Sequence, residues 1–414
     1  MTRAVNSKSM PVAGATMALV LLTALNFVNY IDRYLIFPVE GLVQKEFGVS
    51  DSQLGSLTLW FFIAYMFAAP LTGWMGDRYK RKPLIVGGAI FFSTITLLTA
   101  TVHSFAALMI RHAALGVGEA SFGIFGAAVL ADFYPARERN RVLTIFYIAI
   151  PVGAAIGYGM GGWLGQAHGW RFPFYVNAVP GLIVAGLIWL LMKEPVRGGS
   201  ESKTTAIAKT RVMGLFVNPA YLFAVLGMAM VVFSLGGISA WVPLFLNRFG
   251  GYSVAQAGLM VGGVTAVSGL LGTVVGGWAA HRWLKKNYRA LYLISAWSAL
   301  LGVAPAVLAF FGPRWAMLPG IGVSLFCIML GSGPLNAAIV NSVGAAIRST
   351  AIAVELFAIH ALGDMPSPKL IGMVSDASNL RIGLALTLVT LLIASGVLFL
   401  GAKHAPPLPE SKPA

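Results

Sequence analysis

Seven ionisable side chains interrupt the long apolar stretches of this chain. They are Asp32, Arg33, Arg111, Glu119, Glu355, Asp364 and Lys369. A charged side chain at the centre of a bilayer costs about 2.5–3.5 kcal/mol on insertion scales, so such residues usually face a cavity or a partner. A buried carboxylate near a cation can take up and release a proton, and an arginine can hold an anionic group. These positions are therefore the first candidates for chemistry.

The spacing of four of these residues predicts how they are used. Asp32 and Arg33 are adjacent, so they point about 100° apart on a helix and are expected to engage other helices or a substrate. Arg111 and Glu119 lie two helical turns apart, about 12 Å, on roughly the same side, so both are expected to line one cavity. Structural ion pairs between helices are the alternative, and they are compatible with a functional role.

These charges suggest a coupling hypothesis. Asp32 and Glu119 are the candidate proton-coupling carboxylates, and Arg33 and Arg111 are the cations that tune them. Protonation of one carboxylate would free an arginine to hold an anionic head group, or the reverse. The predicted substrate-binding residues are Arg33, Arg111, Glu119, Tyr147 and Tyr158.

A second group lies near the end of the chain. His360 and Asp364 are four residues apart and are followed by Pro366 and Pro368. Two prolines must interrupt the helical hydrogen bonds, and broken membrane helices line sites or act as gates. We therefore predict a gating or structural role for Asp364 and a proton-coupling role for His360. A packed, hydrogen-bonding histidine is the alternative.

Long apolar segments must position these residues. The 414 residues are 57% hydrophobic and only 10% charged, where soluble domains carry about 25% charged residues. Segments of about 20 apolar residues suffice to cross a bilayer core of about 30 Å. Twelve such spans are predicted, at 14–37, 53–75, 84–102, 106–131, 142–166, 173–192, 221–247, 254–280, 289–311, 316–340, 350–374 and 382–402.

The basic residues predict the topology. With both termini in the cytoplasm, 21 of the 29 Lys and Arg fall in cytoplasmic segments, five in outer loops and three inside spans. This asymmetry is the positive-inside pattern and accounts for most of the net charge of +15. Nucleic-acid binding is therefore not expected. The single cysteine, Cys327, excludes an intrachain disulfide.

An internal repeat divides the chain. The pattern S-x-x-Q-x-G occurs at residues 50–55 and again at 253–258, and residues 73–82 match residues 277–286. The two offsets are 203 and 204, which predicts a duplicated six-span unit. Parallel repeats of this kind typify the major facilitator architecture. We predict an all-α membrane protein with an N-terminal six-helix bundle (1–192), a cytoplasmic linker (193–219) and a C-terminal six-helix bundle (220–414).

Residues 73–82 also resemble the signature loop of the major facilitator superfamily, although Lys80 stands where the motif prefers glycine. Four further motifs, in order along both halves, are similar to the Spinster family. They are residues 29–34 (NYIDRY), 116–122 (GVGEASF), 145–153 (IFYIAIPVG) and 360–368 (HALGDMPSP). This resemblance implies a transporter of sphingolipids or lysophospholipids that uses buried charges of its first and fourth spans.

The signature loop predicts a cytoplasmic gate. Asp77 is expected to sit against the positive N-terminal end of span 350–374, pinned by arginines of the next cytoplasmic loop. The alternative is a loop that only satisfies topology. The predicted gating residues are Asp77, Arg78, Arg81, Asp132, Arg137, Arg139 and Asp364.

These features predict a multi-pass protein of the cell (inner) membrane, a secondary transporter that moves an amphipathic anionic or zwitterionic lipid by proton-coupled alternating access. A carrier of small organic anions or drugs is the nearest alternative, and a membrane-embedded lipid enzyme or scramblase is the alternative from another class. We expect protons, membrane lipids and the lipid substrate as partners, no cofactor or metal, no enzymatic activity, and a monomer.

Overall fold

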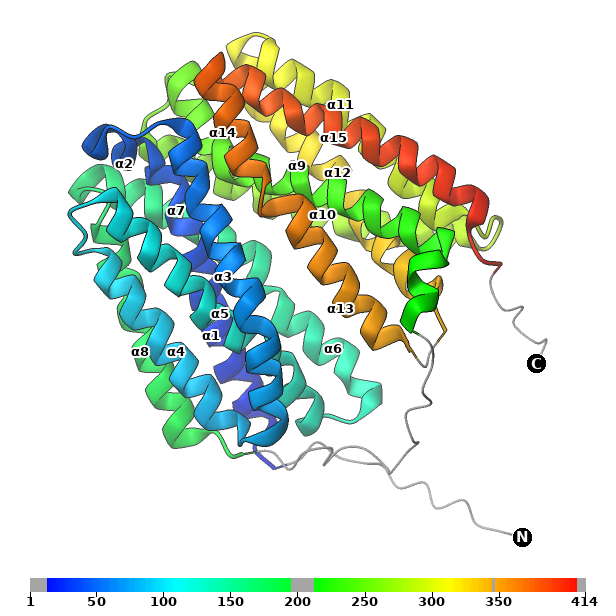
Figure 1. The fold of residues 1–414 in the computed structure, drawn as a ribbon, viewed down its shortest axis with the longest axis horizontal. Helices are drawn as coiled ribbons and strands as arrows, with labels where there is room; N and C mark the ends of the chain where they lie inside the picture. Colours follow the sequence, from blue (N-terminus) through cyan, green and yellow to red (C-terminus); the bar gives the residue numbers. More distant parts are fainter. Residues whose placement is uncertain (1–12, 195–211, 345–346, 408–414) are drawn as a thin grey trace. The chain divides into compact units, whose positions relative to one another are not determined.

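The structure is a computed structural model that describes residues 13–194, 212–344 and 347–407. All of its regular elements are helices (Figure 1). Those of the first half are α1 (Ala15–Leu35), η1 (Phe37–Val39), α2 (Glu40–Phe47), α3 (Asp51–Arg78), α4 (Arg81–Thr99), α5 (Phe105–Phe133), α6 (Ala136–Tyr147), α7 (Ala149–His168) and α8 (Phe172–Leu191). The second half contains η2 (Val212–Val217), α9 (Pro219–Gly250), α10 (Val254–Leu284), α11 (Ala290–Phe311), η3 (Arg314–Ala316), α12 (Met317–Asn341), α13 (Arg348–Ile359), η5 (His360–Asp364), α14 (Ser367–Ala377), α15 (Leu380–Gly401) and η6 (Ala402–His404).

Eleven helical segments of the described residues are long and apolar enough to cross a membrane. The predicted span 350–374 is the one that does not qualify, because it is divided into α13, the single π-helical turn η5, and α14 (Figure 1). Gly363 within η5 has non-helical dihedral angles, with φ −105° and ψ −107°. The predicted interruption is therefore present, but it lies just before Pro366 and Pro368.

The chain forms two compact units. Unit 1 contains Met1–Tyr34, Ile63–Gly157 and Arg171–Ala206, and unit 2 contains Leu35–Phe62, Tyr158–Trp170 and Ile207–Ala414. One boundary between the units, after Ala206, falls within the predicted linker 193–219, most of which lies outside the described residues, while residues 35–62 and 158–170 group with unit 2. The division into residues 1–192 and 220–414 stays a prediction.

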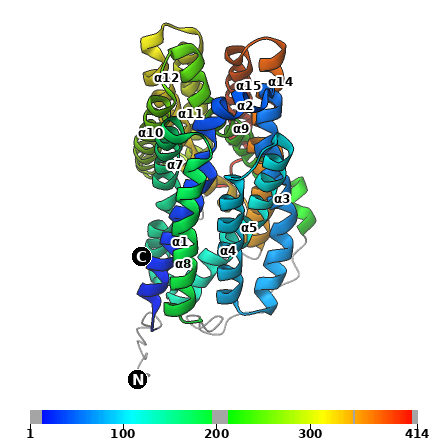
Figure 2. The same ribbon diagram turned by 90° about the vertical axis from the view of Figure 1, so that its left-hand side faces the viewer.

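Small residues allow close helix packing in unit 1. Helix α4 packs between α5 and α8 (Figure 2). A Cβ atom on Gly88 or Gly181 would lie within 2.1 Å of a serine Oγ on the neighbouring helix. On α7, a Cβ on Gly153 would lie 2.7 Å from Tyr30 Cβ, and one on Gly157 would lie 2.6 Å from the Ile31 carbonyl oxygen. These glycines therefore allow α7 to approach α1 closely.

Unit 2 is organised around α9, which is buried along most of its length. Helices α11 and α15 run alongside each other (Figure 1), and α10 packs on α12. The α10–α12 contact is closest at Gly272 and Gly276, where a Cβ would lie 2.6 and 2.1 Å from carbonyl oxygens of α12.

The internal repeat has the same local structure in both copies. Ser50 with Gln53, and Ser253 with Gln256, each form a reciprocal capping box that begins a long helix. At the other ends of these helices an arginine lies over a tryptophan four residues earlier, at 4.4 Å for Arg78 over Trp74 and 4.6 Å for Arg282 over Trp278. The sequence repeat is therefore also a structural repeat.

Candidate functional site

A buried ion pair joins α1 to α5 in unit 1. Arg33 donates to Oε2 of Glu119 through Nη2 at 2.7 Å and through Nε at 2.9 Å. The Glu119 side chain is fully buried, and that of Arg33 is 21% exposed. Oε1 of Glu119 is buried without a hydrogen-bond partner among the described residues, although Asn29 lies nearby. The pair thus holds Arg33 while one carboxylate oxygen stays unsatisfied.

Asp32 lies next to this pair in sequence but has a different partner. Its Oδ2 accepts a short hydrogen bond from Thr96 Oγ1 on α4. Its Oδ1 is buried and has no partner within the described part of the chain, and the amide of Asn177 on α8 is close but equally unsatisfied. The expectation that Asp32 and Arg33 engage other helices rather than each other is confirmed.

Aromatic and imidazole groups surround Arg33. Its guanidinium carbon lies 5.3 Å from the ring centroid of Tyr30 and 5.8 Å from that of Tyr65. His112 on α5 is buried, with 6% exposed, and lies within the electrostatic reach of Arg33. Sequence reasoning did not identify Tyr65, Thr96 or His112. Only the position of His112, seven residues before Glu119 on one helix face, was a usable signal.

The structure does not bring Arg111 to this cluster. Its Nη1 donates to the Leu98 carbonyl oxygen and, at 3.0 Å, to Thr101 Oγ1, so it caps the C-terminal end of α4. Arg111 and Glu119 therefore do not converge as expected. Tyr147 is 46% exposed at the end of α6 and stacks edge-on with Phe146. Substrate contacts by Arg111 and Tyr147 stay predictions.

Tyr158 and the pair on η5 belong to unit 2. Tyr158 is buried and donates to the Ser239 carbonyl oxygen of α9 at 2.6 Å, which is a packing contact. His360 Nδ1 lies 2.9 Å from Oδ1 of Asp364, as the four-residue spacing predicts, and its ring stacks on Phe62. The π-helical turn thus carries an imidazole–carboxylate pair.

The signature loop of unit 1 contains part of the predicted network. Arg81 forms a short ion pair with Asp132 at the end of α5. Arg78 lies over Trp74, and Arg139 donates to the Tyr134 carbonyl oxygen at 3.1 Å. The side chains of Asp77 and Arg137 lie outside the described residues.

A polar cluster in unit 2 was not predicted as a site. Arg248, at the end of α9, donates to both carboxylate oxygens of Asp51 at 2.6 and 2.7 Å and to Gln44 Oε1 at 2.5 Å. Ser375 of α14 donates to Asp51 as well. We call Gln44, Asp51, Arg248 and Ser375 the Asp51–Arg248 clamp. It joins a segment of the first half of the chain to helices of the second half.

Helix termini reinforce this clamp. Asp376 accepts the backbone N–H groups of Asp51 and Ser52 at 2.8 and 3.0 Å, and Lys369 donates to the Ser52 carbonyl oxygen at 2.9 Å. Helices α3 and α14 approach each other closely here, since a Cβ on Gly55 would lie 2.3 Å from the Pro368 carbonyl oxygen. We call this contact between α3 and α14 the charged seam.

The second copy of S-x-x-Q-x-G forms an equivalent but uncharged contact, the neutral seam, between α10 and α7. Gln166 Oε1 accepts the backbone N–H of Ala255 at 2.9 Å. A Cβ on Gly258 would lie 2.4 Å from the Tyr158 carbonyl oxygen and 3.1 Å from Gly162 Cα. In both copies, a polar side chain caps the new helix and the glycine permits close contact.

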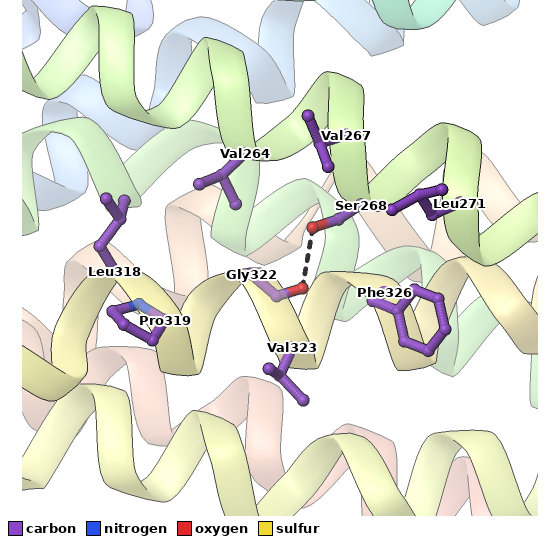
Figure 3. Close-up of a pocket in the computed structure, with 9 residues that line it drawn as sticks. All are labelled: Val264, Val267, Ser268, Leu271, Leu318, Pro319, Gly322, Val323 and Phe326. Atoms are coloured by element: carbon purple, nitrogen blue, oxygen red, sulfur yellow. Dashed lines mark hydrogen bonds between the residues drawn. The ribbon is translucent and has the colours of Figure 1, made fainter.

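A groove of about 420 Å³ lies between α10 and α12 (Figure 3). Ser268 donates to the Gly322 carbonyl oxygen at 2.9 Å, and the other lining side chains are apolar. Because no ionisable residue lines it, this groove does not fit an anionic head group.

Comparisons with known proteins agree with this fold. Residues 22–368 match the model of the Major Facilitator Superfamily. The structure is similar to that of a bacterial homologue of the human lysosomal transporter Spinster in an inward-facing conformation, with a TM-score of 0.85, 22% identity, and coverage of 95% of this chain and 98% of that chain. A D-xylose–proton symporter shares the fold with a TM-score of 0.75 at 16% identity, over 95% of this chain and 99% of that one. The class of protein is therefore a major facilitator transporter, and not an enzyme.

Curated relatives narrow the class. The chain is 32% identical over 383 residues to Protein spinster homolog 1 of Xenopus laevis, covering 86% of this chain and 72% of that protein. It is 32% identical over 414 residues to the Sphingosine-1-phosphate transporter SPNS2 of Danio rerio, covering 90% of this chain and 81% of that one. The chain belongs to the Spinster family of the Major Facilitator Superfamily.

Proposed function

We propose that this protein is a secondary active transporter that moves an amphipathic anionic or zwitterionic lipid, of the lysophospholipid or sphingosine-phosphate type, by proton-coupled alternating access. The observation that carries the proposal is the buried Arg33–Glu119 pair beside Asp32, with one unsatisfied oxygen on each carboxylate. The relative of Danio rerio named for sphingosine-1-phosphate supports the substrate class.

Arg33 is the proposed head-group residue. A guanidinium binds phosphate oxygens in a fork, as it binds a carboxylate. While Glu119 is ionised, it occupies both Nε and Nη2 of Arg33. Protonation of Glu119 would weaken this pair and release Arg33 to the substrate phosphate. Substrate and Glu119 thus compete for one cation, and this competition couples proton binding to lipid binding.

Asp32 is the second proposed proton site. Thr96 satisfies one of its oxygens, and burial disfavours an ionised carboxylate whose other oxygen has no donor. The nearby amides of Asn29 and Asn177 supply donors that a small helix movement would bring to the unsatisfied oxygens. The His360–Asp364 pair on η5 is a further proposed proton-coupling and gating element.

Two gates are proposed at opposite membrane faces. The positive-inside count places the Arg81–Asp132 loop in the cytoplasm, where it would close the inner side together with Asp77, Arg78, Arg137 and Arg139. The same count places the Asp51–Arg248 clamp on the outer side, where it would close the outer entrance. We further propose a monomer in the cell membrane with both termini in the cytoplasm.

Reconstitution tests the substrate class. Purified protein in liposomes is given a fluorescent lysophospholipid, sphingosine-1-phosphate or succinate, with and without an imposed pH gradient. We expect movement of one or both lipids that depends on the gradient, compared with protein-free liposomes. Transport of succinate alone would overturn the lipid assignment. Lipid movement that ignores the gradient would indicate a scramblase instead.

A further inference from the structure

Glu40 is a buried carboxylate that none of the contacts above uses. It is the first residue of α2, and only 1% of it is exposed. Helix α2 packs closely against α9 here, since a Cβ on Gly41 would lie 2.9 Å from Leu244 Cδ1. Oε2 of Glu40 is buried and has no hydrogen-bond partner among the residues that the structure describes. An ionised carboxylate is costly in this position unless a cation is available to it.

Arg248 is the cation that acts on Glu40, and it is already paired with Asp51. Arg248 on α9 and Asp51 on α3 both lie within electrostatic reach of Glu40. Arg248 gives both terminal nitrogens to Asp51 and shares one of them with Gln44. One guanidinium therefore serves two carboxylates, and Asp51 holds its hydrogen bonds. An ionised Glu40 would add a second negative charge beside Asp51.

The other charged groups of this region do not compensate Glu40. Asp376 and Lys369 of α14 bind the backbone at the start of α3. The beginning of α10 has no ionisable residue before His281. The remaining charged or titratable side chains on α2 and the adjoining end of α7 are exposed: Lys45, Glu46 and His168.

We propose that Glu40 is a proton-binding site, separate from Asp32 and Glu119, that is protonated while the Asp51–Arg248 clamp is closed and releases its proton when the clamp opens. In the closed clamp, a proton removes the unpaired charge beside Asp51. Opening separates α2 and α3 from α9 and α14 and admits water, which solvates the ionised carboxylate. The ligand is a proton, and the bond formed on closing is the O–H bond of the carboxylic acid.

The proposal fixes the direction of the pH effect. Closing takes up one proton, so falling pH favours the closed clamp and rising pH favours the open one. One proton changes the ratio of closed to open molecules at most tenfold for each pH unit. The neutral seam between α7 and α10 has no such group, so only the charged seam responds to protons in this way.

Spin labels across the clamp test this inference, which rests on the proposed alternating access but requires no substrate. Labels are placed at Lys45→Cys and Ser378→Cys, two exposed positions on opposite sides of the clamp, in a Cys327→Ser background. Distances are measured by double electron–electron resonance from pH 5 to 9, with the lipid-transport assay run in parallel. We expect the ratio of the short-distance to the long-distance population to fall by up to tenfold per pH unit as pH rises.

Variants identify the responsible group. Glu40→Gln mimics the protonated form and should hold the clamp closed. The pH slope, meaning the change in the logarithm of the closed-to-open ratio per pH unit, should fall by up to one. Glu40→Asp keeps a titratable group and should retain the slope, which separates titration from packing. Glu46→Gln is the matched control, an exposed carboxylate on the same helix that accepts Trp170 Nε1. It should behave as the unsubstituted protein.

The inference is overturned if Glu40→Gln keeps the full pH slope, or if the labelled protein shows no pH-dependent distance. Its failure is distinguishable from failure of the proposed function. A clamp that titrates through Glu40 in a protein that moves no lipid refutes only the substrate assignment. Gradient-driven lipid movement with an unchanged slope in Glu40→Gln refutes only the role of Glu40.

Discussion

At the residue scale, Asp32 and Glu119 have a common arrangement. Each accepts hydrogen bonds through one oxygen, Asp32 from Thr96 and Glu119 from Arg33, and leaves the other oxygen buried and unsatisfied among the described residues. Burial favours the protonated form of such a carboxylate and a nearby donor favours the ionised form, and the proposed proton coupling depends on the balance between these two effects. In the proposed mechanism Arg33 connects this balance to the substrate, since it is the cation that Glu119 holds.

The sequence predicted the charges but only some of their partners. Intramembrane charge identified Asp32, Arg33 and Glu119, and helical geometry excluded a simple Asp32–Arg33 pair. It could not predict Thr96, because hydroxyl side chains are common in spans and only the packing of α4 on α1 selects this one. The sequence predicted that Arg111 lines one cavity with Glu119, and packing again decided otherwise. The long side chain of Arg111 reaches back to the end of α4 instead of following its helix face.

A comparison of two arginines tests the role of Arg33. Lysine keeps the charge but cannot make the two-nitrogen contact with Glu119 or with a phosphate. We expect Arg33→Lys to reduce lipid transport about tenfold, equivalent to about 1.4 kcal/mol. Arg289→Lys is the matched control and should stay near the unsubstituted rate, because Arg289 is exposed at the start of α11 and lies over the Tyr288 ring. Equal losses in both variants would contradict this assignment.

At the element scale, S-x-x-Q-x-G carries two physical functions. Serine and glutamine begin the helix with a capping box, and the glycine lets another helix approach within van der Waals contact of its backbone. The sequence predicted the repetition but not this use, because the partners are other helices. The interruption of the eleventh span was predicted from its prolines. Its position at η5 depends on packing, since a Cβ on Gly363 would lie 2.9 Å from Val232 Cγ1.

Substitution of the seam glycines tests this account. A Cβ at Gly55 or Gly258 would overlap a backbone oxygen that cannot move aside easily. We expect Gly55→Ala and Gly258→Ala each to cost about 1–3 kcal/mol of stability, as overpacking does, and to shift label distances toward the open clamp. Gly263→Ala on α10 is the control, because a Cβ there meets open space. A melting temperature unchanged in all three variants would refute the close packing.

The charged cap on α3 should respond to acid differently from Glu40. Burial raises the pKa of Asp376, but hydrogen bonds from Ser52 and from the backbone of Asp51 outweigh it and hold the pKa below its ordinary value. A lowered pKa means that the contribution of Asp376 is present above its ordinary value of 3.8 and is lost only as pH falls through the lower one.

The corresponding variant is Asp376→Asn. Removal of a charged helix cap typically costs about 0.5–2 kcal/mol, so the closed population in the spin-label measurement should fall at every pH. The slope between pH 5 and 9 should not change, because Asp376 stays ionised throughout that range. If the pH slope is lost in Asp376→Asn but kept in Glu40→Gln, then Asp376, and not Glu40, is the group that takes up the proton.

At the scale of the whole molecule, the fold was largely predictable and the clamp was not. Apolar segments, basic loops and the repeat predicted the helices and the superfamily, which the comparisons confirm. Arg248 is one of the five basic residues that the charge count assigns to outer loops, and the sequence indicated no further role for it. Its pairing with Asp51, 197 residues earlier in the chain, exists only once helices of both halves are packed together. No local pattern reports a contact of that separation.

The central claim is proton coupling by the carboxylates Asp32 on α1 and Glu119 on α5. Lipid movement driven by a pH gradient measures it most directly. Proteoliposomes receive a fluorescent lysophospholipid, and its transfer between leaflets is followed with and without the gradient for the unsubstituted protein, Asp32→Asn, Glu119→Gln and the control Glu46→Gln. We predict that the gradient accelerates transfer by the unsubstituted protein and by Glu46→Gln, and that at least one of the other two variants loses this dependence. Full gradient dependence in both Asp32→Asn and Glu119→Gln would contradict the account.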